Sequence, residues 1–159
     1  RVVKSPGDVS GVNGLILPGG ESTAITKLVR LAGLEEPLKH LIASGLPIWG
    51  TCAGAIMLGS GGIFGCLEVD IVRNAYGPQI HSRLARGTFM GHTIPMVFIR
   101  APRIVRAGAA LDVLGRLDDE IVAIRKDHIL ATSFHPELSH DLTVTRCFLD
   151  LARSQSFCA

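Results

Sequence analysis

Residues 46–58 read LPIWGTCAGAIML, and this stretch decides the fold. The first apolar run predicts a strand and the second predicts a helix, with Cys52 at the sharp turn between them. Gly50 and Gly54 flank the cysteine, because a Cβ atom at either position would clash in so tight a turn. The turn also places the thiol at a helix N-terminus, where the helix dipole favours the thiolate. We therefore predict a nucleophilic cysteine at the end of a strand.

Strands and helices alternate on both sides of this unit. The spacing predicts strands over 14–17, 68–73, 96–99, 112–117, 120–126 and 129–134, with a hairpin turn at Asp127-His128. It predicts helices over 22–32, 35–44 and 141–153, the first capped by Ser22 and stopped by Gly33. Alternation followed by an antiparallel stretch indicates one α/β domain over residues 1–159, with an added hairpin.

Composition narrows the function classes. The chain has 159 residues, 47% of them hydrophobic, and a net charge of +2, which is too small to indicate a nucleic-acid partner. Residues 41–67 carry no charge, but their glycines and Pro47 favour a buried strand–helix unit over a membrane span. The four cysteines form no C-x-x-C pair, so we expect no zinc site and a reducing, cytoplasmic location.

A second segment, ATSFHPEL over residues 131–138, supplies a candidate base. A strand leads into His135, and Pro136 ends it because proline has no N–H to donate. His135 and Glu137 point to the same side of an extended chain. A carboxylate beside the imidazole holds one tautomer and leaves the other ring nitrogen for a thiol. The sequence thus predicts a nucleophile, a base and an orienting acid in Cys52, His135 and Glu137.

The turn after the first strand suits an anionic group. Gly19-Gly20-Glu21-Ser22 lacks the Gly-Lys-Ser/Thr ending of a phosphate loop. A glycine-rich turn before a helix still offers backbone N–H groups to a carboxylate or an oxyanion. Arg73 and Arg100 each end a predicted strand, where a guanidinium can clamp a carboxylate.

These segments together resemble a known family. The motifs are LPGGEST over residues 17–23, GTCAG over 50–54, VRN over 72–74, FIRAP over 98–102 and SFHPEL over 133–138, in that order. They resemble the class I, or triad, glutamine amidotransferases, and among these the glutaminase subunits of pyridoxal 5′-phosphate synthase. The resemblance covers about residues 2–153 and implies a three-layer, mostly parallel, doubly wound sheet of flavodoxin-like type.

The resemblance also implies a reaction. Cys52 attacks the side-chain amide of L-glutamine, His135 protonates the departing ammonia and later activates water, and Glu137 orients His135. The substrate is held by Gly20, Glu21, Ser22, Arg73, Ile99 and Arg100. Ammonia passes to a barrel-shaped synthase subunit, docking to which activates the glutaminase, and the glutaminase itself uses no metal or organic cofactor.

The chain departs from the family pattern in two places. Family members begin with a further strand and helix that carry a Leu-Gln-Gly segment, whereas this sequence begins near the second strand. The segment between the helix predicted after Cys52 and Arg73 is glycine-rich and short, which would alter the shape of the pocket or of the docking surface. An absent inner strand would expose backbone ladders and apolar surface, so we expect the 159-residue chain alone to be poorly stable and nearly inactive.

Three interpretations remain open on sequence. The first is a glutaminase of pyridoxal 5′-phosphate synthesis whose amino-terminal strand and helix are missing from this sequence. The second is a non-catalytic remnant that at most binds a partner. The third is a class I glutaminase of another pathway, such as imidazole glycerol phosphate synthesis, against which the GGEST segment argues.

Overall fold

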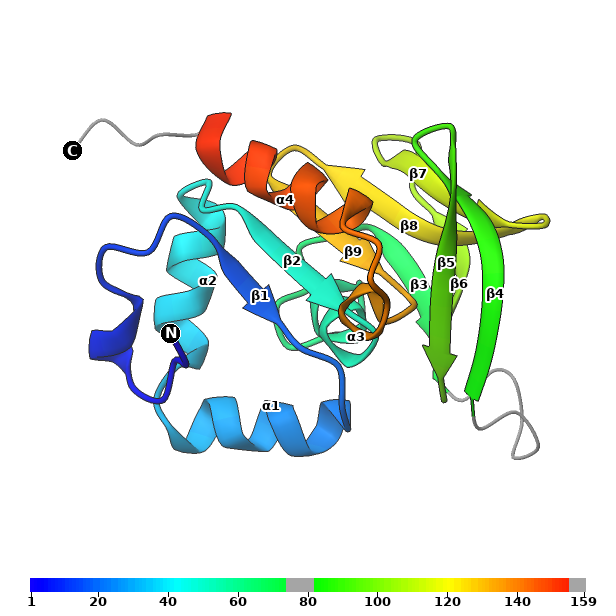
Figure 1. The fold of residues 1–159 in the computed structure, drawn as a ribbon. Coiled ribbons are helices and arrows are strands. Elements are labelled where there is room, and N and C mark those ends of the chain that lie inside the picture. The colour runs from blue at the N-terminus through cyan, green and yellow to red at the C-terminus, as the bar shows by residue number, and fades with distance from the viewer. Residues whose placement is uncertain (74–81, 155–159) are drawn as a thin grey trace.

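The computed structural model describes residues 1–73 and 82–154 (Figure 1). The strands are β1 Leu15–Leu17, β2 Ile48–Thr51, β3 Val69–Val72, β4 Ser82–Phe89, β5 His92–Ile99, β6 Arg103–Ala107, β7 Asp112–Leu117, β8 Glu120–Lys126 and β9 Ile129–Thr132. The α-helices are α1 Ser22–Leu31, α2 Glu35–Ala43, α3 Ala53–Leu58 and α4 Thr143–Ser154, and short 3₁₀ turns cover η1 Pro6–Val9 and η2 Pro136–Leu138.

All nine strands join one mixed sheet. Its main path runs β1-β2-β9-β8-β7-β4-β5, and β6 pairs with both β3 and β8. β1 pairs parallel with β2, and β2 pairs parallel with β9, whereas β8 and β9 form an antiparallel hairpin. Figure 1 shows the sheet running from β1, beside α1 and α2, to the β4–β5 pair at the other end. The carboxyl ends of β1, β2 and β9 therefore meet at one edge, where the candidate residues follow each strand.

Successive residues of β2 enter opposite cores. Ile48 packs with α1, α2 and α3 through residues such as Leu38 and Leu58, whereas Trp49 packs with α4 on the other face. The Trp49 and Phe148 ring centroids lie 5.6 Å apart. Because both faces of β2 are covered, all four of its residues are buried, as expected of a central parallel strand.

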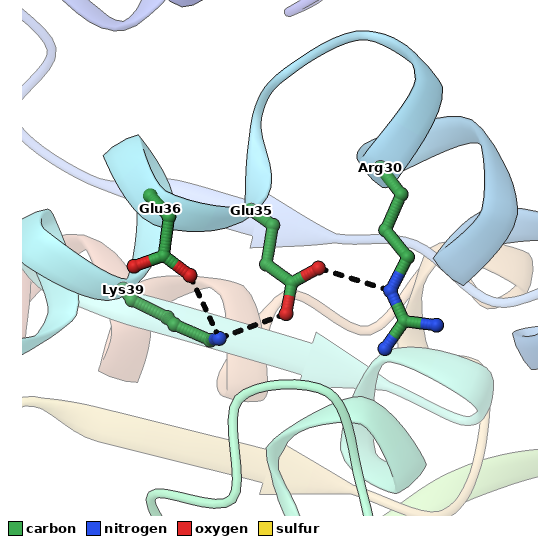
Figure 2. Close-up of polar contacts among 4 residues, drawn as sticks. All are labelled: Arg30, Glu35, Glu36 and Lys39. Atoms are coloured by element: carbon green, nitrogen blue, oxygen red, sulfur yellow. Dashed lines mark hydrogen bonds and ion pairs between the residues drawn. The ribbon is translucent and has the colours of Figure 1, made fainter.

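Charged side chains hold the corner between α1 and α2 (Figure 2). Arg30 Nε lies 2.9 Å from Glu35 Oε2, and Lys39 Nζ lies 2.8 Å from Glu35 Oε1 and 3.0 Å from Glu36 Oε1. Hydrogen bonds from Lys39 and Arg30 lower the pKa of Glu35, and those to Glu35 and Glu36 raise the pKa of Lys39. All four side chains keep some contact with solvent, so the ion pairs add little to stability and serve mainly to fix the direction of the turn.

The structure departs from the predicted elements in the second half of the chain. The fold class is confirmed, but only β1, β2 and β9 pair in parallel, so the antiparallel part exceeds one hairpin and the sheet is not mostly parallel. β4 and β6 were not predicted, because exposed arginines interrupt their alternation. β5 begins at His92 rather than Met96, and it accommodates Pro95 because it lies at the end of the strand path.

The start of α1 also differs from prediction. Glu21, not Ser22, is the N-cap: its carboxylate accepts hydrogen bonds from the backbone N–H groups of Thr23 and Ala24. Ser22 is instead the first helical residue and is 6% exposed. A longer acidic side chain thus satisfies the free N–H groups, and its negative charge suits the helix N-terminus.

Residues 41–67 were predicted to be a strand and helix rather than a membrane span. The structure divides them into the end of α2, β2, α3 and a connecting loop. Among the described residues, no helix has both the length and the apolar character needed to cross a bilayer.

The close approach of α3 to β1 generates the first prediction. A Cβ atom at Gly54 would lie 2.1 Å from the Leu17 carbonyl oxygen, which is backbone and cannot turn away. We expect Gly54→Ala to lower the free energy of unfolding by about 3 kcal/mol, measured by urea denaturation. Gly61→Ala is the matched control, because no heavy atom lies within 4 Å of its Cβ position. Equal stabilities for the two variants would contradict the close packing of α3 against β1 at Gly54.

Candidate active site

Cys52 lies in the sharp turn between β2 and α3, residues 50–54, which we call the elbow. The backbone of Cys52 has φ 49° and ψ −103°, a conformation that residues other than glycine rarely adopt. The Cys52 N–H donates to the Thr132 carbonyl at 2.8 Å, so the strained residue is tied to the end of β9. Positions 50 and 54 are close enough that a Cβ on Gly50 would lie 2.6 Å from the Gly54 carbonyl. The predicted role of these glycines in a tight turn therefore has a direct steric cause.

His135 follows β9 and lies against the same elbow. The backbone N–H of His135 donates to the Val97 carbonyl at 2.8 Å, and the His135 side chain is largely buried. The Nδ1 atom lies 2.7 Å from Glu137 Oε1, which leaves Nε2 as the second nitrogen of the ring. Gly19 packs against the ring so closely that a Cβ there would lie 2.3 Å from His135 Cε1.

Electrostatics favour the imidazolium form of His135. Its side-chain hydrogen bond with Cys52, and then that with Glu137, raise the pKa of His135 to about 9, against the opposing effect of burial. Burial acts to raise the pKa of Glu137, but the hydrogen bonds from His135 and from backbone outweigh it, so that pKa is lowered. The protonated ring of His135 is therefore coupled to Cys52 on one side and to the Glu137 carboxylate on the other.

One cavity of about 230 Å³ joins the predicted residues. It is lined by Gly20, Glu21, Ser22, Cys52, Ile56, Arg73, Ile99, Arg100 and His135. Glu137 is not among the lining residues and lies behind the imidazole. Ile56 is the one lining residue that the sequence analysis did not single out; it lies one turn after Cys52 in α3, and that spacing is the signal that identifies it.

Glu21 and Arg73 meet at the rim of this cavity. Arg73 Nη2 lies 2.7 Å from Glu21 Oε1 and donates to Thr23 Oγ1 at 3.1 Å. The pKa of Glu21 is lowered first by the backbone hydrogen bonds that cap α1, with a smaller contribution from Arg73. Glu21 therefore anchors the guanidinium in addition to lining the cavity. Asn74, the last residue of the VRN motif, lies outside the described residues.

The described residues contain no group of three His, Cys, Asp or Glu side chains that could hold a metal ion. The cavity instead combines a thiol, an imidazole backed by a carboxylate, two arginines and a glycine-rich turn. This set suits nucleophilic attack on a carbonyl in a substrate that also carries a carboxylate.

Comparison with known proteins confirms the resemblance seen in the sequence. The family model described as the SNO glutamine amidotransferase family matches residues 1–153. A protein named pyridoxal 5′-phosphate synthase subunit PdxT from Parafrankia sp. is 43% identical, over 96% of this chain and 81% of its own length. A protein of the same name from Ruminiclostridium cellulolyticum is 42% identical, over 91% and 81% of the two chains.

Solved structures show the same relationship. One described as a glutamine amidotransferase has a TM-score of 0.88 and 41% identity, and the match covers 95% of this chain and 85% of the other. A structure described as PurLQS from Thermotoga maritima has a TM-score of 0.69 at 15% identity, and the match covers 92% of this chain and 81% of the other. At that identity the second match shows likeness of fold alone.

The raised pKa of His135 gives a prediction with a definite sign. Because the folded pKa of about 9 exceeds the ordinary value of 6.5, His135 contributes stability that is fully present below pH 6.5 and lost as pH rises through 9. We expect Cys52→Ala and Glu137→Gln each to move the His135 pKa down towards 6.5 and to reduce this loss. NMR titration of the ring, with urea denaturation across the same pH range, measures both effects.

Glu36→Gln removes an acid from the distant α2 cluster and serves as the control. A His135 titration near 6.5 in the unmodified protein, or one insensitive to both Cys52 and Glu137, would contradict the coupling.

Proposed function

The chain belongs to the SNO glutamine amidotransferase family, and from this premise we propose that it hydrolyses L-glutamine to L-glutamate and ammonia. The observation that carries the proposal is the meeting of Cys52 and His135 at one cavity, with the Cys52 sulfur on a strained turn and the His135 ring bonded to the Glu137 carboxylate behind it. The relatives named as pyridoxal 5′-phosphate synthase subunits favour delivery of the ammonia to a synthase subunit for pyridoxal 5′-phosphate synthesis.

The first half-reaction starts from the thiolate of Cys52 and the imidazolium of His135. The Cys52 sulfur attacks the side-chain amide carbon of glutamine, and the carbonyl oxygen takes up negative charge. The backbone N–H groups that we propose as donors to this charge are that of Ala53, directly after the nucleophile, and that of Gly20 in the glycine-rich turn. His135 gives its proton to the amide nitrogen, the C–N bond breaks, and ammonia leaves a glutamyl thioester on Cys52.

The second half-reaction restores the enzyme. His135, now neutral, takes a proton from water, and the resulting hydroxide attacks the thioester carbon. The C–S bond breaks, glutamate leaves, and the thiolate and imidazolium are regenerated. Glu137 holds His135 through Nδ1 in both half-reactions, so that Nε2 remains directed at the reacting atoms.

The cavity rim binds the amino-acid end of the substrate in this proposal. Arg73 and Arg100 attract the α-carboxylate, and Glu21 holds Arg73 at 2.7 Å while its own charge faces the α-amino group. Gly20, Ser22, Ile56 and Ile99 complete the lining around Cys52 and His135. The cavity volume of about 230 Å³ is in keeping with a single small amino acid.

The partner that we propose is a barrel-shaped synthase subunit, and the location that we propose is the cytoplasm. A synthase partner is supported by the names of the relatives, which are called pyridoxal 5′-phosphate synthase subunits, and its barrel shape is what the family resemblance implies. The location is supported by free thiols at Cys52, Cys66 and Cys147 among the described residues, with burial raising the pKa of Cys66 to about 11.

The glutaminase proposal predicts distinct losses for two members of the triad. In a chain extended by the amino-terminal strand and helix of its family, and with the synthase subunit present, we expect Cys52→Ala to lower ammonia release at least about 10³-fold, because no nucleophile remains. Glu137→Gln should lower kcat about a hundredfold, because the imidazolium loses its acceptor. Glutamate and ammonia are measured together by coupled assay.

His92→Gln, a histidine on β5 away from the cavity, is the matched control and should retain full activity. Ammonia release that survives in Cys52→Ala would refute the mechanism. A complete lack of activity with the synthase subunit, in a chain extended by the amino-terminal strand and helix of its family, would favour the non-catalytic remnant.

We further propose that the domain is N-terminally incomplete relative to its family and that one more strand belongs beside β1. A groove of about 760 Å³ runs between the first residues, Arg1 to Lys4, and β1, with apolar side chains of α1 and α2 among its walls. Among the described strands, β1 pairs only with β2. The matches leave 15–19% of the relatives' own lengths uncovered, which is enough chain for a strand and a helix.

The backbone of β1 is oriented to accept that strand. The Leu15 N–H donates to the Pro47 carbonyl on the β2 side, so the N–H of Ile16 points to the groove side. Ile16 and Leu28 are 50% and 64% exposed, and both line the groove. An apolar strand continuous with Arg1 would cover them and pair with the free edge of β1.

This proposal predicts a gain from extending the chain. Joining to Arg1 the residues that precede the matched region in the Parafrankia sp. relative should raise Tm by about 10 °C and restore ammonia release with the synthase subunit. It should also slow amide hydrogen exchange at Ile16, because that N–H gains a partner.

Ile16→Pro is the matched control, because proline is tolerated on an open edge but removes the N–H that the added strand needs. It should change the 159-residue chain little and cancel most of the gain in the extended one. Full partner-stimulated activity of the 159-residue chain alone would refute the proposal.

A further inference from the structure

Thr132 contacts both arms of the proposed active site without lining the cavity. It ends β9, is fully buried, and accepts the Cys52 N–H on its carbonyl at 2.8 Å. Its hydroxyl donates to the Phe134 carbonyl at 3.3 Å. Phe134 directly precedes His135, so one residue links the backbone of the nucleophile to the backbone that carries the base.

Trp49 fixes the direction of that hydroxyl. The indole Nε1 donates to Thr132 Oγ1 at 3.2 Å, across the β2–β9 pairing. Trp49 is 3% exposed, so its N–H needs a partner inside the core. A threonine hydroxyl has one proton, and with the indole N–H on a lone pair that proton is left for the Phe134 carbonyl. The donor–acceptor order is therefore Trp49 to Thr132 to Phe134.

The bond to Phe134 braces the bend where the chain leaves the sheet. Ser133 N–H donates to the Val122 carbonyl at 2.9 Å, and His135 N–H donates to the Val97 carbonyl at 2.8 Å, so neighbouring residues are tied to different strands. The Thr132 hydroxyl closes the bend between these two ties. The Phe134 ring is itself packed, 5.8 Å from that of Phe98, which holds the far side.

We propose that Thr132, oriented by Trp49, is a positioning residue that holds the Cys52 sulfur and the His135 ring at the distance and orientation that they need to react together. It touches neither the substrate nor the reacting atoms, and it acts through the Cys52 N–H and the Phe134 carbonyl. The inference rests on the proposed function in taking Cys52 and His135 as the reacting pair.

Thr132→Val tests this, because it keeps the shape and removes the hydroxyl. We expect iodoacetamide to alkylate Cys52 about fivefold more slowly at about pH 7, because the sulfur loses its aligned imidazolium. Peptide mass spectrometry follows the alkylation. The NMR titration of His135 should shift to lower pH as its contact with Cys52 lengthens. With the synthase subunit present, kcat for glutamine should fall about tenfold while KM changes less than about twofold.

Thr132→Ser keeps the hydroxyl and should restore all three quantities. Thr88→Val is the matched control: its hydroxyl also donates to a main-chain carbonyl, that of Arg116 at 3.4 Å, but on β4 away from the site. Trp49→Phe keeps an aromatic ring and removes the N–H together with the five-membered part of the indole, and it leaves the Thr132 hydroxyl in place, so it should give a smaller loss of about threefold in the alkylation rate. The double variant should be no slower than Thr132→Val, because both act through one hydroxyl.

Wild-type alkylation and His135 titration in Thr132→Val would overturn the proposal, as would a Thr132→Ser variant as impaired as Thr132→Val. If Thr132→Val does not fold, an unchanged alkylation rate and titration in Trp49→Phe overturn it instead. Alkylation and NMR need no glutamine turnover. A Thr132 effect in those two measurements alongside absent ammonia release would therefore fault the glutaminase proposal and leave the positioning role standing.

Discussion

The fit of the elbow against β1 is the constraint on which the rest of the structure depends. Cys52 has φ 49°, and the chain can make this turn only because Gly50 and Gly54 lie almost in contact and Gly54 lies against the Leu17 carbonyl. The parallel strands β1 and β2 and the helix α3 are therefore in van der Waals contact at this point. The thiol is displayed at that convergence, and its position follows from packing rather than from any contact that the sulfur makes.

The base reaches the same place by a different route. His135 is not held by the elbow: its backbone bonds to Val97 in β5, and its ring lies between Gly19 and the Glu137 carboxylate. The antiparallel strands that extend the sheet thus supply one wall of the site and the anchor for its histidine. This explains why a parallel core of three strands needs so large an extension to make one cavity.

Sequence alone predicted the elements whose signals are local. The elbow, the β8–β9 hairpin turn at Asp127 and the helix ending in Arg153 all follow from glycines, turn residues and apolar spacing over a few positions. β4 and β6 could not be predicted, because their exposed arginines are accommodated by pairing with distant strands. The meeting of Cys52 and His135 was predicted from two strand ends and from the family resemblance. The resemblance also placed Glu21 and Arg73 at the substrate, but their ion pair was not predicted, since a contact spanning fifty-two positions leaves no local pattern.

The open edge of β1 and the chemistry of the site are physically connected. β1 leads directly into Pro18, Gly19 and Gly20, and Gly19 forms the surface on which the His135 ring rests. A strand of three residues paired on one side only has few interactions to hold that surface in place. Any movement of β1 at its free edge shifts the imidazole as well, because Gly19, which follows β1, is packed tightly against the His135 ring. A strand that filled the groove would therefore stiffen the base as well as cover apolar surface, although it would touch none of the three reacting side chains.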